Sequence, residues 1–434
     1  MSSTALLVMK RHQYSSQRTL GAHRKLRWRH SMLTCPLLLI TALGLKADPV
    51  WTLTTAPYNH WVSVASSADG NTLAAASNPG LIYVSTNSGA TWAAATNAPN
   101  GYWWCITVSG DGSNMAAGID GGSIYTSRDY GATWICTGAP DNFWWSIASS
   151  ADGRTLAAAA LCNGWDNTAP GHIYTSSDSG ATWTPAPDLG FWVSVASSCD
   201  GSRLTAVSSE GLVYVSTNSG AGWQPTGAPS QNGCSIASSG DGNKLVVVAN
   251  GGPVCTSTNA GATWTVATNA PSANWASVSS STDGTTLAAV QWGGQVYTSA
   301  DAGTTWSQNS VPDTFQAVGL WGIAVSKDGN KVVAAGNGGA GGPLYLLQPL
   351  PSLNIAHTGS DAIVSWPSWA TGFALQQSVD LAAATWTNTM TVPQLTNGQN
   401  RISIDRSEGR CFLRLAFPTG NPPGRSPYPP PIPF

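Results

Sequence analysis

Two aspartates, Asp141 and Asp188, are the candidates for acid–base chemistry in this sequence, and each stands a few residues before an aromatic segment (DNFWW and DLGFW). Two carboxyl groups about 5–10 Å apart hydrolyse glycosidic bonds, one as the acid and the other as base or nucleophile. The alternative is that both are solvated loop acids or local caps. The sequence therefore offers one pair to test for hydrolysis of a neutral glycan and leaves catalysis undecided.

No other reactive arrangement is indicated. No two cysteines have the Cys-x-x-Cys spacing of a zinc site, there is no phosphate-binding loop, and neither His60 nor His172 accompanies a recognisable nucleophile motif. We therefore expect no metal and no cofactor. Seven cysteines follow residue 47, an odd number, so at least one thiol is free or pairs between chains.

The first 47 residues resemble an export signal. They carry 8 of the 19 Lys and Arg residues and no acid, and a 14-residue apolar run from Met32 to Leu45 follows the basic cluster. Such a run is short for a bilayer span, although an uncleaved anchor is the alternative. We expect an exported protein, periplasmic, at the cell surface or extracellular, without a membrane span in the mature chain.

Removal of that segment leaves 11 basic residues against 21 acidic ones, 11 − 21 = −10. A net-acidic chain without a basic run is a poor candidate for nucleic-acid binding.

Aromatic residues recur at one position of a repeat. Eight residues before a Ser-x-Asp-Gly turn, or next to that place, stand Trp61, Trp103, Trp144, Trp192, Trp275 and Trp321, with Tyr102 beside them and Trp165 in a separate loop. One interpretation is a ring of exposed faces that binds a neutral glycan or a partner protein. The other is that these side chains pack between repeats.

The repeat itself has a period of 41–48 residues between turn aspartates, which stand at 69, 111, 152, 200, 241, 283 and 328. Each copy reads as four short strands joined by turns, the length of one propeller blade. The seventh copy lacks its fourth strand, and "VWTLTTAP" at 50–57 supplies a matching one. The prediction is an all-β, seven-bladed β-propeller over residues 48–350, closed by an N-terminal strand in the last blade.

Six copies of S-x-[DN]-x-G-x-[TG]-W, of which "SSDSGATW" at 176–183 is one, are similar to the Asp-box, or bacterial neuraminidase repeat, of sialidases and other exported propellers. The resemblance implies a structural turn between third and fourth strands, capped by an Asp or Asn. The positions are Asp129, Asp178, Asp301, Asn87, Asn218 and Asn259. Half the copies carry Asn, which cannot act as an acid, so the box is scaffold. Sialidase activity is not expected, because the face predicted to bind ligands has no arginine for a substrate carboxylate.

After residue 350 the period ends. Residues 351–417 give about six strand-like runs that resemble a small fibronectin-like or immunoglobulin-like β-sandwich, and residues 418–434 form a Pro-rich tail expected to be disordered. The leading hypothesis is non-catalytic binding of a neutral glycan or partner protein on a Trp-rich, acidic face of the propeller. A glycoside hydrolase and a pure scaffold are the alternatives, and the sequence does not indicate an oligomeric state.

Overall fold

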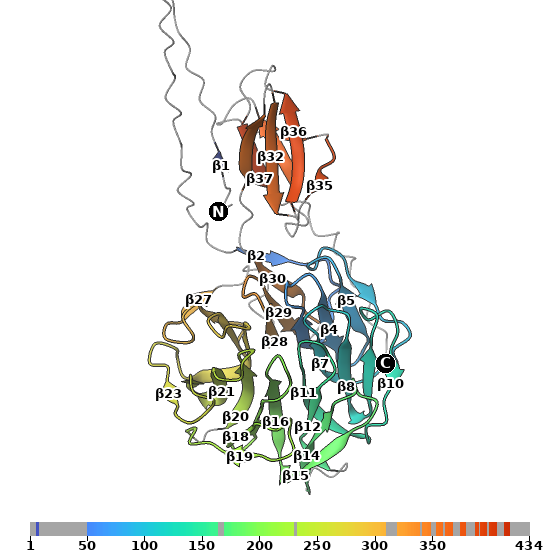
Figure 1. Ribbon diagram of the computed structural model, residues 1–434, viewed down its shortest axis with the longest axis vertical. Coiled ribbons are helices and arrows are strands. Elements are labelled where there is room, and N and C mark those ends of the chain that lie inside the picture. The colour runs from blue at the N-terminus through green and yellow to red at the C-terminus, as the bar shows by residue number, and fades with distance from the viewer. Residues whose placement is uncertain are drawn as a thin grey trace, which may run out of the picture. The chain divides into compact units, whose positions relative to one another are not determined.

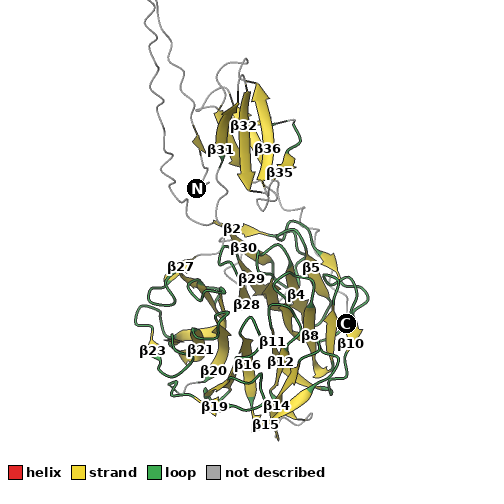
Figure 2. Ribbon diagram, viewed as in Figure 1, coloured by secondary structure: helices red, strands yellow, loops and turns green. Residues whose placement is uncertain are grey.

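The structure is a computed structural model of the chain. It describes residues 6–7, 50–163, 169–229, 232–309, 319–338, 341–348, 353–358, 361–367, 374–378, 387–389, 391–396, 399–405 and 412–416. All regular elements among these residues are β-strands (Figures 1 and 2). The described residues divide into two compact units, a larger one of residues 50–348 and a smaller one of residues 6–7 with those between 353 and 416.

The larger unit consists of repeats of four antiparallel strands, as the alternation of small apolar and polar residues predicts. The first strands of the described repeats are β3 (Trp61–Ser66), β7 (Trp103–Val108), β11 (Asn142–Ser149), β16 (Trp192–Ser197), β20 (Gly233–Ser238), β24 (Ala273–Ser280) and β28 (Gly319–Val325). The second strands are β4 (Leu73–Ser77), β8 (Met115–Gly122), β12 (Leu156–Ala160), β17 (Leu204–Ser208), β21 (Leu245–Gly252), β25 (Leu287–Gln291) and β29 (Val332–Asn337).

The third strands are β5 (Ile82–Ser85), β9 (Ile124–Ser127), β14 (Ala169–Ser176), β18 (Val213–Ser216), β22 (Val254–Ser257), β26 (Val296–Ser299) and β30 (Leu344–Gln348). The fourth strands, of which all but β15 have two or three residues, are β6 (Ala93–Ala94), β10 (Ile135–Cys136), β15 (Thr184–Gly190), β19 (Gln224–Pro225), β23 (Thr265–Val266) and β27 (Ser307–Asn309). The strand β13 (Cys162–Asn163) pairs with β14. The last repeat receives its fourth strand from the other end of the unit, because β2 (Val50–Leu53) pairs with β30.

The first strands contact one another in sequence order, and β28 contacts β3, so they surround a common centre (Figure 1). Backbone hydrogen bonds follow the same path at the turns between first and second strands. Ala68, Gly110, Ala151, Cys199, Gly240 and Thr282 each donate an N–H to the carbonyl at the equivalent position of the next repeat, at 2.7–2.8 Å. The Asp328 N–H donates to the Ala68 carbonyl at 2.9 Å, so the last repeat is hydrogen-bonded to the first.

A β-bulge interrupts every described first strand. In β11, for example, Trp144 pairs with Ala160 and Ser146 with Ala159, so Trp145 is an extra residue. A bulge bends its strand and re-aims the side chain at the extra position. The extra residues are Val62, Trp104, Trp145, Val193, Cys234, Ala276 and Trp321.

The turns that match the Asp-box are held by local hydrogen bonds. Asp178 accepts the Thr182 N–H at 2.9 Å and the Thr182 hydroxyl at 2.6 Å, and the next residue, Ser179, has a φ of 59°. Asn87 accepts the Thr91 N–H at 2.9 Å and donates its amide to the Thr91 hydroxyl at 2.8 Å. The amide and the carboxylate therefore cap the same donor, which explains how the two residues alternate among repeats.

These turns make stability depend on acidity. Hydrogen bonds from the Thr182 hydroxyl and N–H, followed by that from Ser176, lower the pKa of Asp178 from 3.8 to about 2. A carboxyl with a lowered pKa in the folded state stabilises above its unfolded pKa, and this contribution disappears as pH falls through the folded pKa. The thermal stability of the wild type should therefore fall between about pH 4 and pH 2. The thermal stability of the Asp178→Asn variant should fall less over that range.

The test is the thermal midpoint of Asp178→Asn and of the triple variant with Asn also at Asp129 and Asp301, measured from pH 2 to pH 7. Both variants should match the wild type near pH 7, because Asn87, Asn218 and Asn259 already occupy equivalent turns. Equal acid sensitivity of all three proteins would contradict the argument.

Packing between repeats forms the core of the larger unit. The second strands are rich in fully buried alanine, for example Ala157–Ala160, which lets neighbouring sheets approach closely. Trp103 packs against Ala76 and Ile82 of the preceding repeat in one buried cluster.

The described residues of the smaller unit form two four-stranded sheets. One comprises β31 (Asn354–Thr358), β32 (Asp361–Pro367), β36 (Gln399–Asp405) and β35 (Gln394–Thr396). The other comprises β1 (Leu6–Leu7), β37 (Phe412–Ala416), β33 (Ala374–Ser378) and β34 (Thr387–Asn388). Side chains of both sheets, including Trp366, Ile402, Leu375 and Leu413, share one buried cluster.

Candidate functional site

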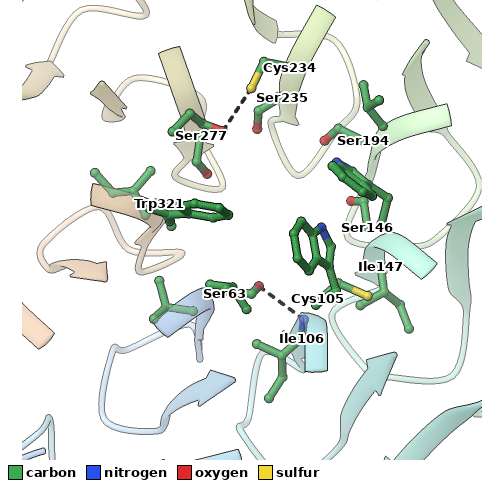
Figure 3. A pocket seen from close by; sticks show the side chains of 18 of the residues that line it. Ser63, Cys105, Ile106, Ser146, Ile147, Ser194, Cys234, Ser235, Ser277 and Trp321 are labelled. Atoms are coloured by element: carbon green, nitrogen blue, oxygen red, sulfur yellow. Dashed lines mark hydrogen bonds between the residues drawn. The ribbon is translucent and has the colours of Figure 1, made fainter. Parts of the chain in front are cut away.

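A cavity of about 200 Å³ lies among the first strands of the larger unit (Figure 3). Each of the seven described first strands contributes, because the bulge directs the extra residue and its successor towards the common centre. The aromatic part of the lining includes Trp104, Trp145, Trp321 and Trp292, and the polar part includes Ser63, Ser146, Ser194, Ser235 and Ser277. No charged side chain lines the cavity among the described residues.

Four tryptophans that line the cavity form a continuous group, which we call the Trp cluster: Trp145, Trp104, Trp321 and Trp292. The ring centroids of Trp104 and Trp145 are 4.7 Å apart, those of Trp104 and Trp321 are 6.1 Å apart, and those of Trp321 and Trp292 are 4.4 Å apart. The first three are half-buried, and Trp292 is 41% exposed. The remaining extra residues are smaller (Val62, Val193, Cys234 and Ala276), so the cavity is aromatic on one side only.

Serine hydroxyls hold the polar part in place. The Oγ atoms of Ser63, Ser146, Ser194 and Ser235 accept backbone N–H groups of the following repeat, at 3.1–3.3 Å. Figure 3 shows the bond from Ile106 to Ser63 and the hydroxyls of the other repeats around the same space. A hydroxyl that accepts one bond keeps its own hydrogen to donate, so this part of the cavity offers donors to an uncharged polar ligand.

The end at which the first strands begin, which we call the top face, has acidic residues in the second to fourth repeats. Asp141 directly precedes β11, and the segments around Asp120, Asp188 and Glu210 lie beside the start of a first strand. Asp120 is half-buried, and burial raises its pKa. Asp141 and Asp188 are exposed and do not line the cavity.

The expectation that the repeated tryptophans present open faces to a ligand is wrong at Trp61, Trp103, Trp144, Trp192 and Trp275, which are 0–2% exposed. They precede the bulge, so they point between neighbouring sheets and not towards the centre. Each ring packs edge to face against a tyrosine of its own repeat, with centroids 5.2–5.4 Å apart. The packing interpretation therefore holds for these five side chains.

The other predicted binding residues differ in their environments. Trp321 lines the cavity, and Tyr102 is 60% exposed on the top face. Trp165 lies outside the described residues. The sequence interpretation missed Trp104 and Trp145 as cavity residues, and it placed Trp292 in a loop of the top face without naming it as a binding residue. The doubled tryptophans at 103–104 and 144–145 were the available signal, because a strand with strict alternation cannot bury both neighbours on one face.

No cluster of metal-ligating side chains is present in the part of the chain that the structure describes. The imidazoles of His60 and His172 bond to the Asn337 side chain and the Ala186 carbonyl, at 3.2 and 2.8 Å. The described residues include no helix long and apolar enough to cross a membrane.

Comparison with solved structures shows that the larger unit has the fold of a β-propeller. Similar structures include YCF48 bound to D1 peptide, with 16% identity, a TM-score of 0.53, and coverage of 69% of this chain and 97% of that chain. YCF48 from Cyanidioschyzon merolae gives 16% identity and a TM-score of 0.52 over 69% and 98% of the two chains. The Cps50 (Swd1) β-propeller domain from Myceliophteria thermophila gives 12% identity and 0.55 over 69% and 100%. Comparisons with protein-family models and with curated proteins gave no match.

Proposed function

We propose that this chain is a non-catalytic binding propeller that holds a segment of a partner protein over the central cavity. The single observation that carries the proposal is the Trp cluster at an uncharged cavity. Tryptophan is enriched among the residues that dominate protein–protein binding energy, because it removes a large apolar area from water and loses little conformational freedom. One similar propeller, YCF48, has been solved with a bound peptide.

The proposal includes a closed ring of seven blades of Asp-box type, with a small β-sandwich as a second domain. It is supported by the pairing of β2 with β30 and by the backbone hydrogen bonds that return to Ala68. The turn geometry at Asp178 and Asn87 supports the Asp-box assignment. Export through residues 1–47 is part of the proposal and rests on the basic and apolar character of that segment.

A neutral glycan is the second candidate ligand. Indole faces and serine hydroxyls together suit the apolar face and the hydroxyls of a sugar ring. A hydrolase receives less support, because the exposed carboxylates of Asp141 and Asp188 stand outside the cavity lining.

The proposed function is tested by selecting peptides from a phage-displayed random library on the immobilised protein and measuring the affinity of enriched peptides by tryptophan fluorescence. Enriched peptides should bind the wild type and the control variant Ile135→Ser alike, since Ile135 is 67% exposed and does not line the cavity. Trp145→Ala and Trp321→Ala should weaken binding by at least about tenfold, the size of a buried aromatic anchor.

A panel of neutral polysaccharides is titrated in parallel, and the same samples are assayed for released reducing ends. Failure to enrich any peptide, or peptides that bind both tryptophan variants as well as the wild type, would overturn the peptide proposal. Saturable polysaccharide binding without release would favour the glycan, and release would favour hydrolysis.

A further inference from the structure

We propose that the bound segment presents an arginine or lysine side chain, whose cationic end lies against the Trp cluster beside Asp120. This inference rests on the proposed function and specifies the chemistry of its ligand. It is carried by three observations: the distribution of charge, the environment of Asp120 and the geometry of the indoles.

The basic residues of the larger unit lie at one end only, among the repeated turns, whose aspartates accompany them. The described acids outside the repeated turns, Asp120, Asp141, Asp188 and Glu210, lie on the top face. All Lys and Arg residues between positions 50 and 348 fall in or beside the opposite turns: Arg128, Arg154, Arg203, Lys244, Lys327 and Lys331. A face with one sign of charge attracts ligands of the other sign and repels anionic ones.

Asp120 lies beside the strand segments that lead into two members of the Trp cluster. Its backbone N–H bonds the Tyr102 carbonyl at 2.8 Å, and it pairs with Phe143 of β11, so it stands next to the residues two positions before Trp104 and Trp145. Burial raises the pKa of Asp120, and no described residue donates a hydrogen bond to its carboxylate. A half-buried carboxylate without such a donor is stabilised by an incoming cation, because the pair recovers part of the solvation that burial removes.

The indoles supply the second half of the site. Trp321 meets both Trp104 and Trp292 in edge-to-face geometry, at 79° and 62° between ring planes. An edge-to-face pair covers one face of one ring only. Trp292 is 41% exposed and the half-buried Trp321 and Trp104 line the cavity, so indole surface remains accessible to a ligand. A guanidinium or ammonium group over an indole face is attracted by the negative potential of the ring, and its aliphatic stem packs on apolar surface.

The uncharged cavity lining fits this arrangement. The hydroxyl donors around it suit the carbonyl groups of a peptide backbone, while the cation stays near the top face. His60 and His172 are the described imidazoles at this end, and each has a ring nitrogen bonded within the protein.

The test uses two synthetic peptides of one shape, acetyl-Gly-Ser-Arg-Ser-Gly-amide and the same peptide with citrulline in place of arginine. Citrulline keeps the planar end group and removes its charge. The wild-type protein should bind the arginine peptide about tenfold more tightly, and added salt should reduce the difference. Binding is followed by tryptophan fluorescence on the full chain.

Asp120→Asn should weaken the arginine peptide about fivefold to tenfold and leave the citrulline peptide unchanged. The matched controls are Asp141→Asn and Asp188→Asn, exposed acids of the same face that do not line the cavity, which should change either affinity by less than about twofold. Circular dichroism and thermal midpoints verify that the variants are folded.

Equal affinity for the two peptides, or no binding of the arginine peptide at millimolar concentration, would overturn the inference. If library-selected peptides still depend on Trp145 and Trp321 in that case, the proposed function stands and only the cationic preference fails. If binding is also insensitive to the tryptophan variants, both fail.

Discussion

Alanine at Trp144 should lower the free energy of unfolding by about 3–5 kcal/mol, whereas alanine at the next residue, Trp145, should change it by about 1 kcal/mol or less. Trp144 is 1% exposed, donates its indole N–H to the Gly122 carbonyl at 2.8 Å and packs on Tyr174. Its removal leaves a cavity between two repeats and an unsatisfied carbonyl. Trp145 is half-buried and lines an existing cavity, so its removal mainly enlarges that cavity.

Peptide affinity should depend on Trp145 and not on Trp144. The Trp145→Ala variant should bind library-selected peptides weakly and keep nearly the wild-type thermal midpoint. The Trp144→Ala variant should bind them normally at temperatures where it remains folded. The pair Trp103→Ala and Trp104→Ala provides an independent copy of the comparison in the preceding repeat. Urea unfolding and fluorescence titration of the four variants are sufficient. Similar stability losses for both members of a pair would contradict the bulge as the reason for their difference.

Lys331→Ala should destabilise the larger unit by about 2–4 kcal/mol. Lys331 is 3% exposed, and its ammonium group donates to the Ser88 hydroxyl at 2.8 Å, the Asn71 side chain at 3.0 Å and the Gly70 carbonyl at 3.3 Å. These bonds connect the last repeat to the first, residues 243–261 positions apart in the chain. Truncation leaves three polar groups without this donor and also removes the packed aliphatic stem.

The matched control is Lys244→Ala, at the same position of the turn in another repeat. The Lys244 ammonium group bonds one carbonyl, that of Asp283 at 2.7 Å, in an exposed setting. Its removal should cost about 1 kcal/mol or less. Urea unfolding monitored by tryptophan fluorescence compares both variants with the wild type. An equal decrease in the free energy of unfolding for the two variants would mean that the Lys331 contacts between the last and first repeats stabilise the unit no more than the single Lys244 bond does.

The sequence predicted the β-propeller class because its local signals agree with one another. Each Asp-Gly turn, each short strand and each capped Asx turn specifies its own geometry within a few residues, and the period repeats that information. These features need no knowledge of distant contacts. The structure also shows the pairing of β2 with β30 that completes the last repeat, in the register Val50 to Gln348 and Leu53 to Tyr345.

The side-chain orientation in the first strands could not be read in the same way. Regular alternation places Trp103 and Trp104 on opposite faces but does not say which face meets the centre, and the bulge shifts that assignment by one residue. The residue type that fits at the buried position before the bulge also depends on the neighbouring repeat, as Gly233 shows. A Cβ at this position would lie 2.5 Å from Cγ2 of Val207 and 2.6 Å from the Ser208 carbonyl oxygen, so no side chain fits. The environment of Asp120 likewise arises from segments that only the folded structure brings together.

The pairing of β2 with β30 has a consequence for the order in which the chain acquires its structure. The hydrogen bond from the Thr52 hydroxyl to the Leu346 carbonyl joins residues 294 positions apart. During synthesis β2, the strand that completes the last sheet, is therefore made before the rest of the larger unit. It remains without its partner β30 until nearly the whole larger unit has been synthesised. Contacts of this separation close late, because the loop entropy between them is lost before they contribute. Until then the strands Val50–Leu53 and Leu344–Gln348 are open to pairing with other chains, and their pairing is the step that a chaperone would protect.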